Sequence, residues 1–159
     1  MPSSTLYSGG QDDQEDYPPM KTMTQAQIEE FLHAPRHAVV GTNRVDGPPQ
    51  LSPVWYIYEE GRFYISVGVE TAKYRNLQRD PRISICVDGG YPDYRTVIIY
   101  GTVRLVEAGD PSVQEMRWRI IRQYHDSEEN ACRYFESVRH MESVLIVVTP
   151  QKVISQDFN

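Results

Sequence analysis

The sequence predicts a mixed α+β fold, mainly β, in which an antiparallel β-barrel carries helices at its edge. Runs rich in Val, Ile, Tyr and Trp follow one another between residues 37 and 107, and short turn sequences separate most of them. Helical patterns stand mainly before and after this region instead of alternating with the runs. A parallel βαβ fold would alternate the two element types, so this order favours an antiparallel barrel.

The composition is that of one globular domain. The chain has 159 residues, of which 40% are hydrophobic and 24% are charged. A net charge of −6 argues against general nucleic-acid binding, and no apolar stretch is long enough to span a bilayer. Cys86 and Cys132 are far apart, with neither a disulfide pattern nor a metal-ligand spacing around them. We therefore expect two reduced thiols in a cytoplasmic protein without a metal site.

The N-terminal segment differs from the rest of the chain. Residues 1–22 are rich in Ser, Gly, Asp, Gln and Pro and contain almost no aliphatic side chains, which predicts a disordered arm. Docking of this arm on a partner subunit, or over the active site, remains open. The folded domain is expected over residues 23–159. Its first helix would begin with a capping box formed by Thr24 and Gln27, and Pro35 would end it.

The first strands are expected to form hairpins. Residues 37–68 contain three β-like runs, and Asp46-Gly47 and Glu60-Gly61 between them fit tight hairpin turns. Residues 82–88 alternate apolar and polar side chains, as a half-buried strand does.

The second half of the chain adds two strands and two helices. Residues 96–107 predict a long strand with bulky side chains on both faces, and Gly101 marks a bulge or a close backbone approach. Helical spacing follows over residues 110–124 and 127–141, and residues 143–150 return to the sheet. The prediction is therefore about six strands and three helices, besides a short basic helix.

That basic segment joins two predicted strands. Four cations lie between Lys73 and Arg82, after Thr71, which is a plausible helix cap. The free N–H groups of residues 72–74 would carry the positive end of the helix dipole, and Lys73 would add a full charge. Such a helix start suits a phosphate group. The alternative is a solvated polar helix whose cations offset nearby carboxylates.

Two stretches together carry a resemblance to a known family. DGPPQLSPVWY (46–56) and SVGVETAKYRNLQRDPRISICVD (66–88) resemble the paired signature of the pyridoxamine 5′-phosphate oxidase-like superfamily. The similarity covers residue 24 to about residue 107 and is closest to the small F420-binding branch. It implies a six-stranded split β-barrel that binds FMN or the deazaflavin F420. It also implies a homodimer with cofactor sites at the subunit interface.

The resemblance implies roles for two groups of residues. Lys73 would contact the cofactor phosphate with Thr71 and the amides of Ala72 and Lys73, while Arg75 and Asn76 would reach the phosphate or ribityl side. The strand 50–55 would line the ring system, and the end of the next strand would run beside the chain that links ring and phosphate. The implied cofactor-binding residues are Gln50, Ser52, Pro53, Val54, Trp55, Ser66, Val67, Thr71, Ala72, Lys73, Arg75 and Asn76.

The function that follows is an FMN- or F420-dependent oxidoreductase. It would move a hydride between the cofactor and a small conjugated organic substrate, and because the cofactor performs this chemistry, we expect no catalytic nucleophile or triad. The close match in AKYRNLQRDPR (72–82) favours F420. Alternatives are a non-catalytic flavin- or F420-binding or carrier protein, or a dimeric scaffold with an empty barrel. Pyridoxamine 5′-phosphate oxidase activity is disfavoured, because TPQKVISQDFN (149–159) lacks the Arg-x-His element of those enzymes.

Overall fold

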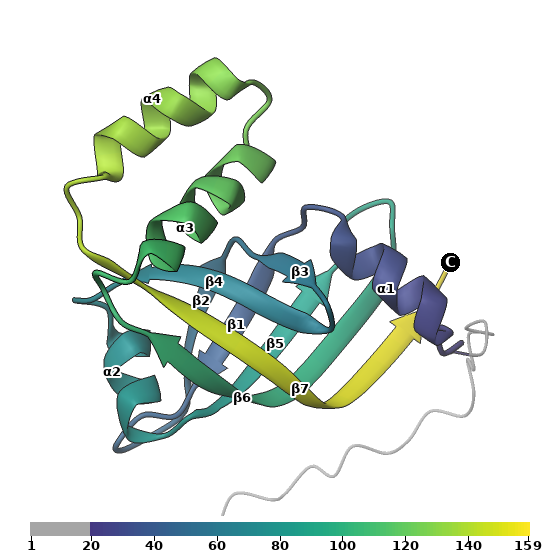
Figure 1. The fold of residues 1–159 in the computed structure, drawn as a ribbon. Coiled ribbons are helices and arrows are strands. Elements are labelled where there is room, and N and C mark those ends of the chain that lie inside the picture. Colours follow the sequence, from purple (N-terminus) through teal and green to yellow (C-terminus); the bar gives the residue numbers. More distant parts are fainter. Residues whose placement is uncertain (1–19) are drawn as a thin grey trace, which may run out of the picture.

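The computed structural model describes residues 20–159, and within them it has seven strands and four helices. All strands form one antiparallel sheet in the order β2-β1-β5-β6-β7-β4-β3, which curls into a split barrel (Figure 1). The strands are β1 (Ala38–Thr42), β2 (Gln50–Val54), β3 (Ile57–Glu59), β4 (Arg62–Gly68), β5 (Arg82–Asp88), β6 (Arg95–Val106) and β7 (Ser143–Asp157). The helices are α1 (Gln25–His33), α2 (Ala72–Arg79), α3 (Pro111–Gln123) and α4 (Glu128–Val138). The predicted mainly β barrel with flanking helices is confirmed.

The predicted number of six strands is wrong, because the second apolar run is divided between two edges of the sheet. In β2, Val54 pairs with Ala38 of β1. In β3, Ile57 pairs with Tyr64 of β4 at the opposite edge. At Trp55-Tyr56 the chain crosses from one edge of the sheet to the other. Neither residue is a typical turn residue, so the run of hydrophobic side chains continues from β2 into β3 and hides the boundary between the two strands.

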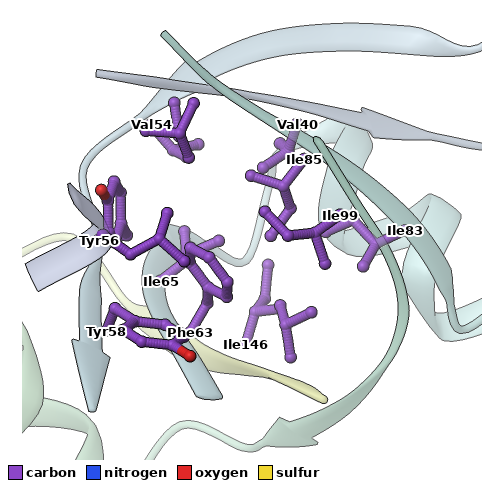
Figure 2. Close-up of a cluster of buried hydrophobic side chains, with 14 of the residues drawn as sticks. Val40, Val54, Tyr56, Tyr58, Phe63, Ile65, Ile83, Ile85, Ile99 and Ile146 are labelled. Atoms are coloured by element: carbon purple, nitrogen blue, oxygen red, sulfur yellow. The ribbon is translucent and has the colours of Figure 1, made fainter. Parts of the chain in front are cut away.

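Figure 2 shows the core that fills the curled sheet. Alternate residues of each strand point inward, as the pleat requires. In β5, for example, Ile83, Ile85 and Val87 are buried while their neighbours are not. The largest fully buried side chains include Tyr56, Phe31, Phe63, Ile65, Ile85, Ile99 and Ile146.

The predicted hairpin turns have different outcomes. Glu60 and Gly61 form a two-residue turn between β3 and β4 with φ of 51° and 72°, so a turn with two positive φ angles is confirmed there. Asp46-Gly47 instead belongs to a longer connection over residues 43–49, and the tight turn predicted at this place is wrong. Gly47 still has a positive φ of 84°, which explains the misleading signal.

Gly101 lies at the predicted bulge. The register between β6 and β7 shifts between Tyr100 and Gly101, where Gly101 stands opposite Pro150. A Cβ atom on Gly101 would lie 2.4 Å from the carbonyl oxygen of Thr149, so only glycine fits. Strand β7 continues to Asp157, beyond the end predicted at residue 150. The bulge allows this, because it accommodates Pro150, which has no N–H to pair with β6.

The helices begin where their caps predict. Thr24 and Gln27 form the reciprocal capping box of α1, Asp110 caps α3 before Pro111, and Ser127 caps α4. In Figure 1, α3 lies against the barrel and α4 lies on the far side of α3 from the sheet. Ala131 is the buried residue of α4, so this helix is held mainly by α3.

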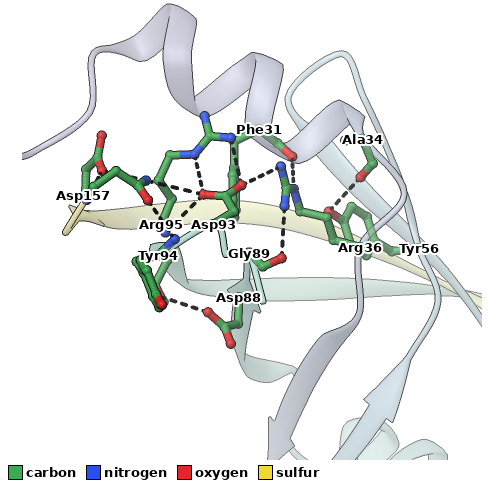
Figure 3. A network of polar contacts seen from close by, with 12 residues as sticks. Phe31, Ala34, Arg36, Tyr56, Asp88, Gly89, Asp93, Tyr94, Arg95 and Asp157 are labelled. Carbon is green, nitrogen blue, oxygen red and sulfur yellow. Dashed lines mark hydrogen bonds and ion pairs between the residues drawn. The ribbon is translucent and has the colours of Figure 1, made fainter. Parts of the chain in front are cut away.

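A polar network ties α1 to the sheet (Figure 3). Asp93 accepts from Arg95 at 2.8 Å and pairs with Arg36 at 3.1 Å. The Arg36 guanidinium also donates to the Phe31 carbonyl at 2.9 Å and lies 3.9 Å from the centre of the Phe31 ring. The Arg95 side chain, by its hydrogen bond, holds the pKa of Asp93 well below its usual range.

The predicted N-terminal arm, residues 1–22, lies outside the described residues except for its last three positions. There, Lys21 pairs with Asp157 through backbone hydrogen bonds of 3.2 and 2.8 Å. Among residues 20–159, no helix is long and apolar enough to cross a bilayer.

Candidate functional site

A pocket of about 450 Å³ opens where β2 and β4 end, beside the start of α2 and beneath α3 and α4. This volume lies in the range of small-molecule sites, about 300–1,000 Å³. The barrel and the segment before α2 contribute Pro53, Val54, Trp55, Ser66, Val67, Gly68 and Thr71. The helices and the segment before β7 contribute Lys73, Arg117, Ile120, Ile121, Tyr134, Val138, Met141, Glu142 and Ser143, and His37 completes the lining.

The start of α2 is built by Thr71, as predicted. Its hydroxyl accepts from the Tyr74 amide at 3.4 Å and donates to the Gly68 carbonyl at 2.8 Å, so it joins the helix to the end of β4. The Arg75 amide bonds to the Thr71 carbonyl. The amides of Ala72 and Lys73 have no acceptor among residues 20–159, which leaves two donors at the positive end of the dipole.

Lys73 adds a charge to this corner. Its side chain is half-buried and lines the pocket, and burial lowers the pKa of its amine. Within the part of the chain that the structure describes, no carboxylate lies within 4.0 Å of the amine. A partly desolvated cation without a carboxylate gains free energy when an anion binds beside it.

The structure brings together only part of the predicted cofactor site. Pocket-lining positions among the predicted residues are Pro53, Val54, Trp55, Ser66, Val67, Thr71 and Lys73. Gln50, Ala72 and Asn76 line a second hollow of about 280 Å³, together with residues 44–46 of the β1–β2 connection. Ser52 and Arg75 line neither of these hollows. The assignment of all these residues to a cofactor stays a prediction.

Three of the predicted cofactor residues that lie outside the main pocket differ in their hydrogen bonding within the protein. Asn76 is buried and donates to the hydroxyl of Thr42 at 3.1 Å, which fastens α2 to β1. Arg75 is exposed and donates to the carbonyl of Glu70 at 2.9 Å. The hydroxyl of Ser52 is buried and has no hydrogen-bond partner among the described residues, which costs free energy unless a ligand or water supplies one.

Sequence reasoning missed the wall that α3 and α4 provide. Arg117 on α3 is 7% exposed, and its guanidinium donates to the carbonyls of Val138 at 2.7 Å and Met141 at 2.9 Å. Ser143 lies 3.4 Å from the same group. Burial lowers the pKa of Arg117. The predicted helical spacing placed Arg117 on α3, but no local signal shows that this face meets the pocket.

An aromatic cluster braces Trp55 beside the pocket. The Trp55 ring stacks on Tyr124 with ring centres 5.1 Å apart and an angle of 11°. Tyr134 from α4 and His125 contact the same indole at 5.6 and 5.7 Å. Aromatic side chains fixed by such contacts lose little further entropy when a ligand packs on them.

Solved structures share this fold. A conserved hypothetical protein from Mycobacterium tuberculosis matches with a TM-score of 0.72 at 24% identity, covering 86% of each chain. An F420 reductase matches with a TM-score of 0.62 at 23% identity, covering 79% of this chain and 94% of that one. An FAD-binding protein from Mesorhizobium loti matches with a TM-score of 0.64 at 16% identity, covering 87% and 96%. At these identities the likeness is one of fold.

The sequence itself carries the family relationship. The family model described as pyridoxamine 5′-phosphate oxidase matches residues 24–157, which include every strand and helix of the structure. The match extends beyond the paired motifs to α3, α4 and β7, where the sequence alone had no distinctive residues. This chain therefore belongs to the pyridoxamine 5′-phosphate oxidase family.

Proposed function

We propose that this chain binds FMN or F420 and moves a hydride between that cofactor and a small conjugated organic substrate. The observation that carries the proposal is the corner at α2, where half-buried Lys73 lines an otherwise largely apolar pocket and the amides of Ala72 and Lys73 have no acceptor among the described residues. A phosphate group suits such a corner, because charge-assisted hydrogen bonds and the helix dipole act together on it.

The pocket residues fit the two ends of such a cofactor. Lys73, Thr71 and the first amides of α2 would hold its phosphate, and Ser66 and Val67 at the end of β4 would run beside the chain that links phosphate and ring. The strand 53–55 would form a wall for the ring. Once bound, the flavin or deazaflavin supplies the hydride chemistry itself.

The chain's own task is to bind, orient and exclude water. Ile120, Ile121 and Val138 make an apolar wall opposite the barrel, and such a wall removes water from the reacting groups. Trp55 is fixed by its stacking on Tyr124, so it offers a rigid surface for a flat substrate. No side chain is needed as a nucleophile in this scheme.

F420 is the preferred cofactor in this proposal. The resemblance in residues 72–82 favours it, and one solved protein with this fold is an F420 reductase. Arg75 supports the same choice, since it is exposed in the first turn of α2 and would meet the acidic tail of F420. FMN has no such tail, so it would offer Arg75 only its phosphate or ribityl side.

A homodimer is also proposed, with cofactor sites at its interface. The strand register aligns Pro53, Val39, Cys86, Ile98 and Ile154 in one row across the outer face of five strands. Exposed Leu51 and Tyr100 lie in the next row. A contiguous exposed apolar face favours burial against another protein surface. Because Pro53 also lines the pocket, a second copy on this face would lie close to the cofactor.

The cofactor proposal is tested by purifying the full chain from a host that makes both FMN and F420. The absorption spectrum and mass of the bound chromophore identify the cofactor. Lys73→Ala should weaken binding about ten- to a hundredfold, since one charge-assisted hydrogen bond contributes roughly 1.5–3 kcal/mol. Lys21→Ala, which removes an exposed lysine outside the pocket, is the matched control. Unchanged affinity in Lys73→Ala would contradict the phosphate assignment.

Catalysis is tested separately from binding. The loaded protein is given reduced F420 and a panel of conjugated ketones, quinones and nitroaromatics, and cofactor oxidation is followed by absorbance. Turnover above the rate of free cofactor supports an oxidoreductase. Tight cofactor binding with no turnover across the panel favours a carrier protein instead.

A further inference from the structure

The pocket holds a second cation, Arg117, which forms no ion pair with any residue that the structure describes. Arg117 is 7% exposed, and its partners are two carbonyls and one hydroxyl, none of which carries a net charge. Among residues 20–159, no carboxylate lies within 4.0 Å of its guanidinium. A buried cation without a counter-ion costs several kcal/mol, so proteins rarely keep one without a use.

The guanidinium also has hydrogen-bonding capacity left. Of its five N–H donors, three are engaged, by Val138, Met141 and Ser143, and the Nε–H and one terminal N–H have no acceptor among the described residues. Those partners belong to the end of α4, the segment that follows it and the start of β7, and they fix the side chain in place. Arg117 is therefore a preorganised group and not a mobile surface charge.

The carboxylate of the pocket does not neutralise Arg117. Glu142 lines the pocket, but its side chain is exposed and lies more than 4.0 Å from the Arg117 guanidinium. Burial lowers the pKa of Arg117, and the neighbouring Tyr134 opposes this shift. The apolar side chains around Arg117, Ile121 and Val138 among them, keep the local dielectric low, which strengthens its attraction for an anion.

We infer that the pocket has a second anion-binding position at Arg117, which takes a carboxylate or phosphate oxyanion of a bound organic ligand. Ile120, Ile121 and Trp55, which line the same pocket, suit an apolar or aromatic body attached to that oxyanion. The inference rests on the proposed function, because the oxyanion belongs either to the substrate or to a second acidic group of the cofactor.

The first experiment uses benzoate and its neutral analogue benzamide as probes. Both are titrated calorimetrically into the full chain as purified. Benzoate should bind at least tenfold more tightly than benzamide, and this preference should vanish in Arg117→Gln. Arg139→Gln is the matched control, since it removes an exposed arginine just after α4 and should keep the preference. A crystal structure of the parent with benzoate should place the carboxylate on Arg117, which settles the position even if Arg117→Gln fails to fold.

The second experiment identifies the source of the oxyanion. The affinities of FMN, which has one phosphate, and of F420, which has further acidic groups, are measured in the same variants. Loss of benzoate preference in Arg117→Gln with both cofactor affinities unchanged assigns the oxyanion to the substrate. Weakening of F420 by tenfold or more, with FMN unchanged, assigns it to the cofactor.

One result overturns the inference. Arg117 only holds the end of α4 if Arg117→Gln changes neither the preference for benzoate nor the affinities for FMN and F420. The same conclusion follows if benzoate binds away from Arg117 in the parent and Arg117→Gln leaves both cofactor affinities unchanged. This result differs from a failure of the proposed function, in which the parent binds neither FMN nor F420. The benzoate titration still decides the inference in that case.

Discussion

Gly101 offers a direct test of how β6 and β7 fit together. Its absent side chain leaves room for the Thr149 carbonyl, which would lie 2.4 Å from a Cβ atom at this position. Ordinary carbon–oxygen contacts are about 3.3 Å or longer, so Gly101→Ala must push the strands apart by nearly 1 Å. The obstacle is backbone and not the end of a flexible side chain, so rotation of a side chain cannot relieve it.

The expected cost follows from this geometry. Overpacking typically costs about 1–3 kcal/mol, and weakening one neighbouring backbone hydrogen bond adds about 1 kcal/mol. Gly101→Ala should therefore destabilise the protein by about 2–4 kcal/mol. For a chain of this size, each kcal/mol lowers the melting temperature by about 2–4 °C. The assay is urea denaturation followed by circular dichroism, in which the midpoint should fall while the slope stays constant.

Gly41→Ala is the matched control in the same sheet. Its Cβ would meet the end of the exposed Leu51 side chain at 3.2 Å, and that side chain is free to move. We expect a change of less than about 1 kcal/mol, since alanine is also less flexible than glycine in the unfolded chain. Equal stability of the Gly101→Ala variant and the parent would refute the close approach of the two strands.

Two further predictions concern Asp93 and Thr71. Arg95 and Arg36 hold the folded-state pKa of Asp93 well below its unfolded value of about 3.9, so its stabilising contribution is fully present above about pH 4 and is lost progressively as the pH falls toward the folded-state pKa. Asp93→Asn should thus cost about 2 kcal/mol in urea unfolding at pH 7 and about 1 kcal/mol less at pH 3, where the unfolded chain already binds the proton, whereas an equal cost at both values contradicts the ion-pair account. Thr71→Ala should remove the cap of α2 at a cost of about 1 kcal/mol and weaken cofactor binding, while Thr71→Ser should keep both. Urea unfolding measures the loss of stability, and calorimetric titration with FMN or F420 measures the loss of affinity. A Thr71→Ala variant that behaves like Thr71→Ser would show that the Thr71 hydroxyl is needed neither for the cap nor for binding.

Features decided by local chemistry were predictable from the sequence. The caps at Thr24 and Thr71, the turn at Glu60-Gly61 and the bulge at Gly101 each depend on a few neighbouring residues. Each of these residue types also has a strong and specific backbone preference. Among them, the Thr71 cap sets the start of α2 and therefore the position of Lys73, the centre of the candidate site.

Features decided by distant contacts were not predictable. The break at Trp55-Tyr56 exists because β2 and β3 find partners at opposite edges of the sheet, and nothing in their own residues marks it. Arg117 reaches the pocket only because α3 packs on β4 and β7, far from the motifs in sequence. The hydrogen bond from the Asn76 amide to the Thr42 hydroxyl was likewise not visible in the sequence, because it joins α2 to a strand 34 residues away.

The change of sheet edge at Trp55-Tyr56 also explains why the site lies where it does. β2 has β1 as its sheet neighbour and leaves its other edge open, and β3 likewise ends the sheet beside β4. In a barrel closed by hydrogen bonds, β2 and β3 would pair with other strands along these edges. A split barrel leaves the backbone groups of the two edges free to bond to a ligand or to another protein surface. Pro53, which has no N–H to donate, is tolerated in β2 because it is an edge strand. This open edge therefore supplies both the wall of the pocket and the edge of the apolar face, so the proposed ligand binding and the proposed dimer should depend on the same few residues of β2.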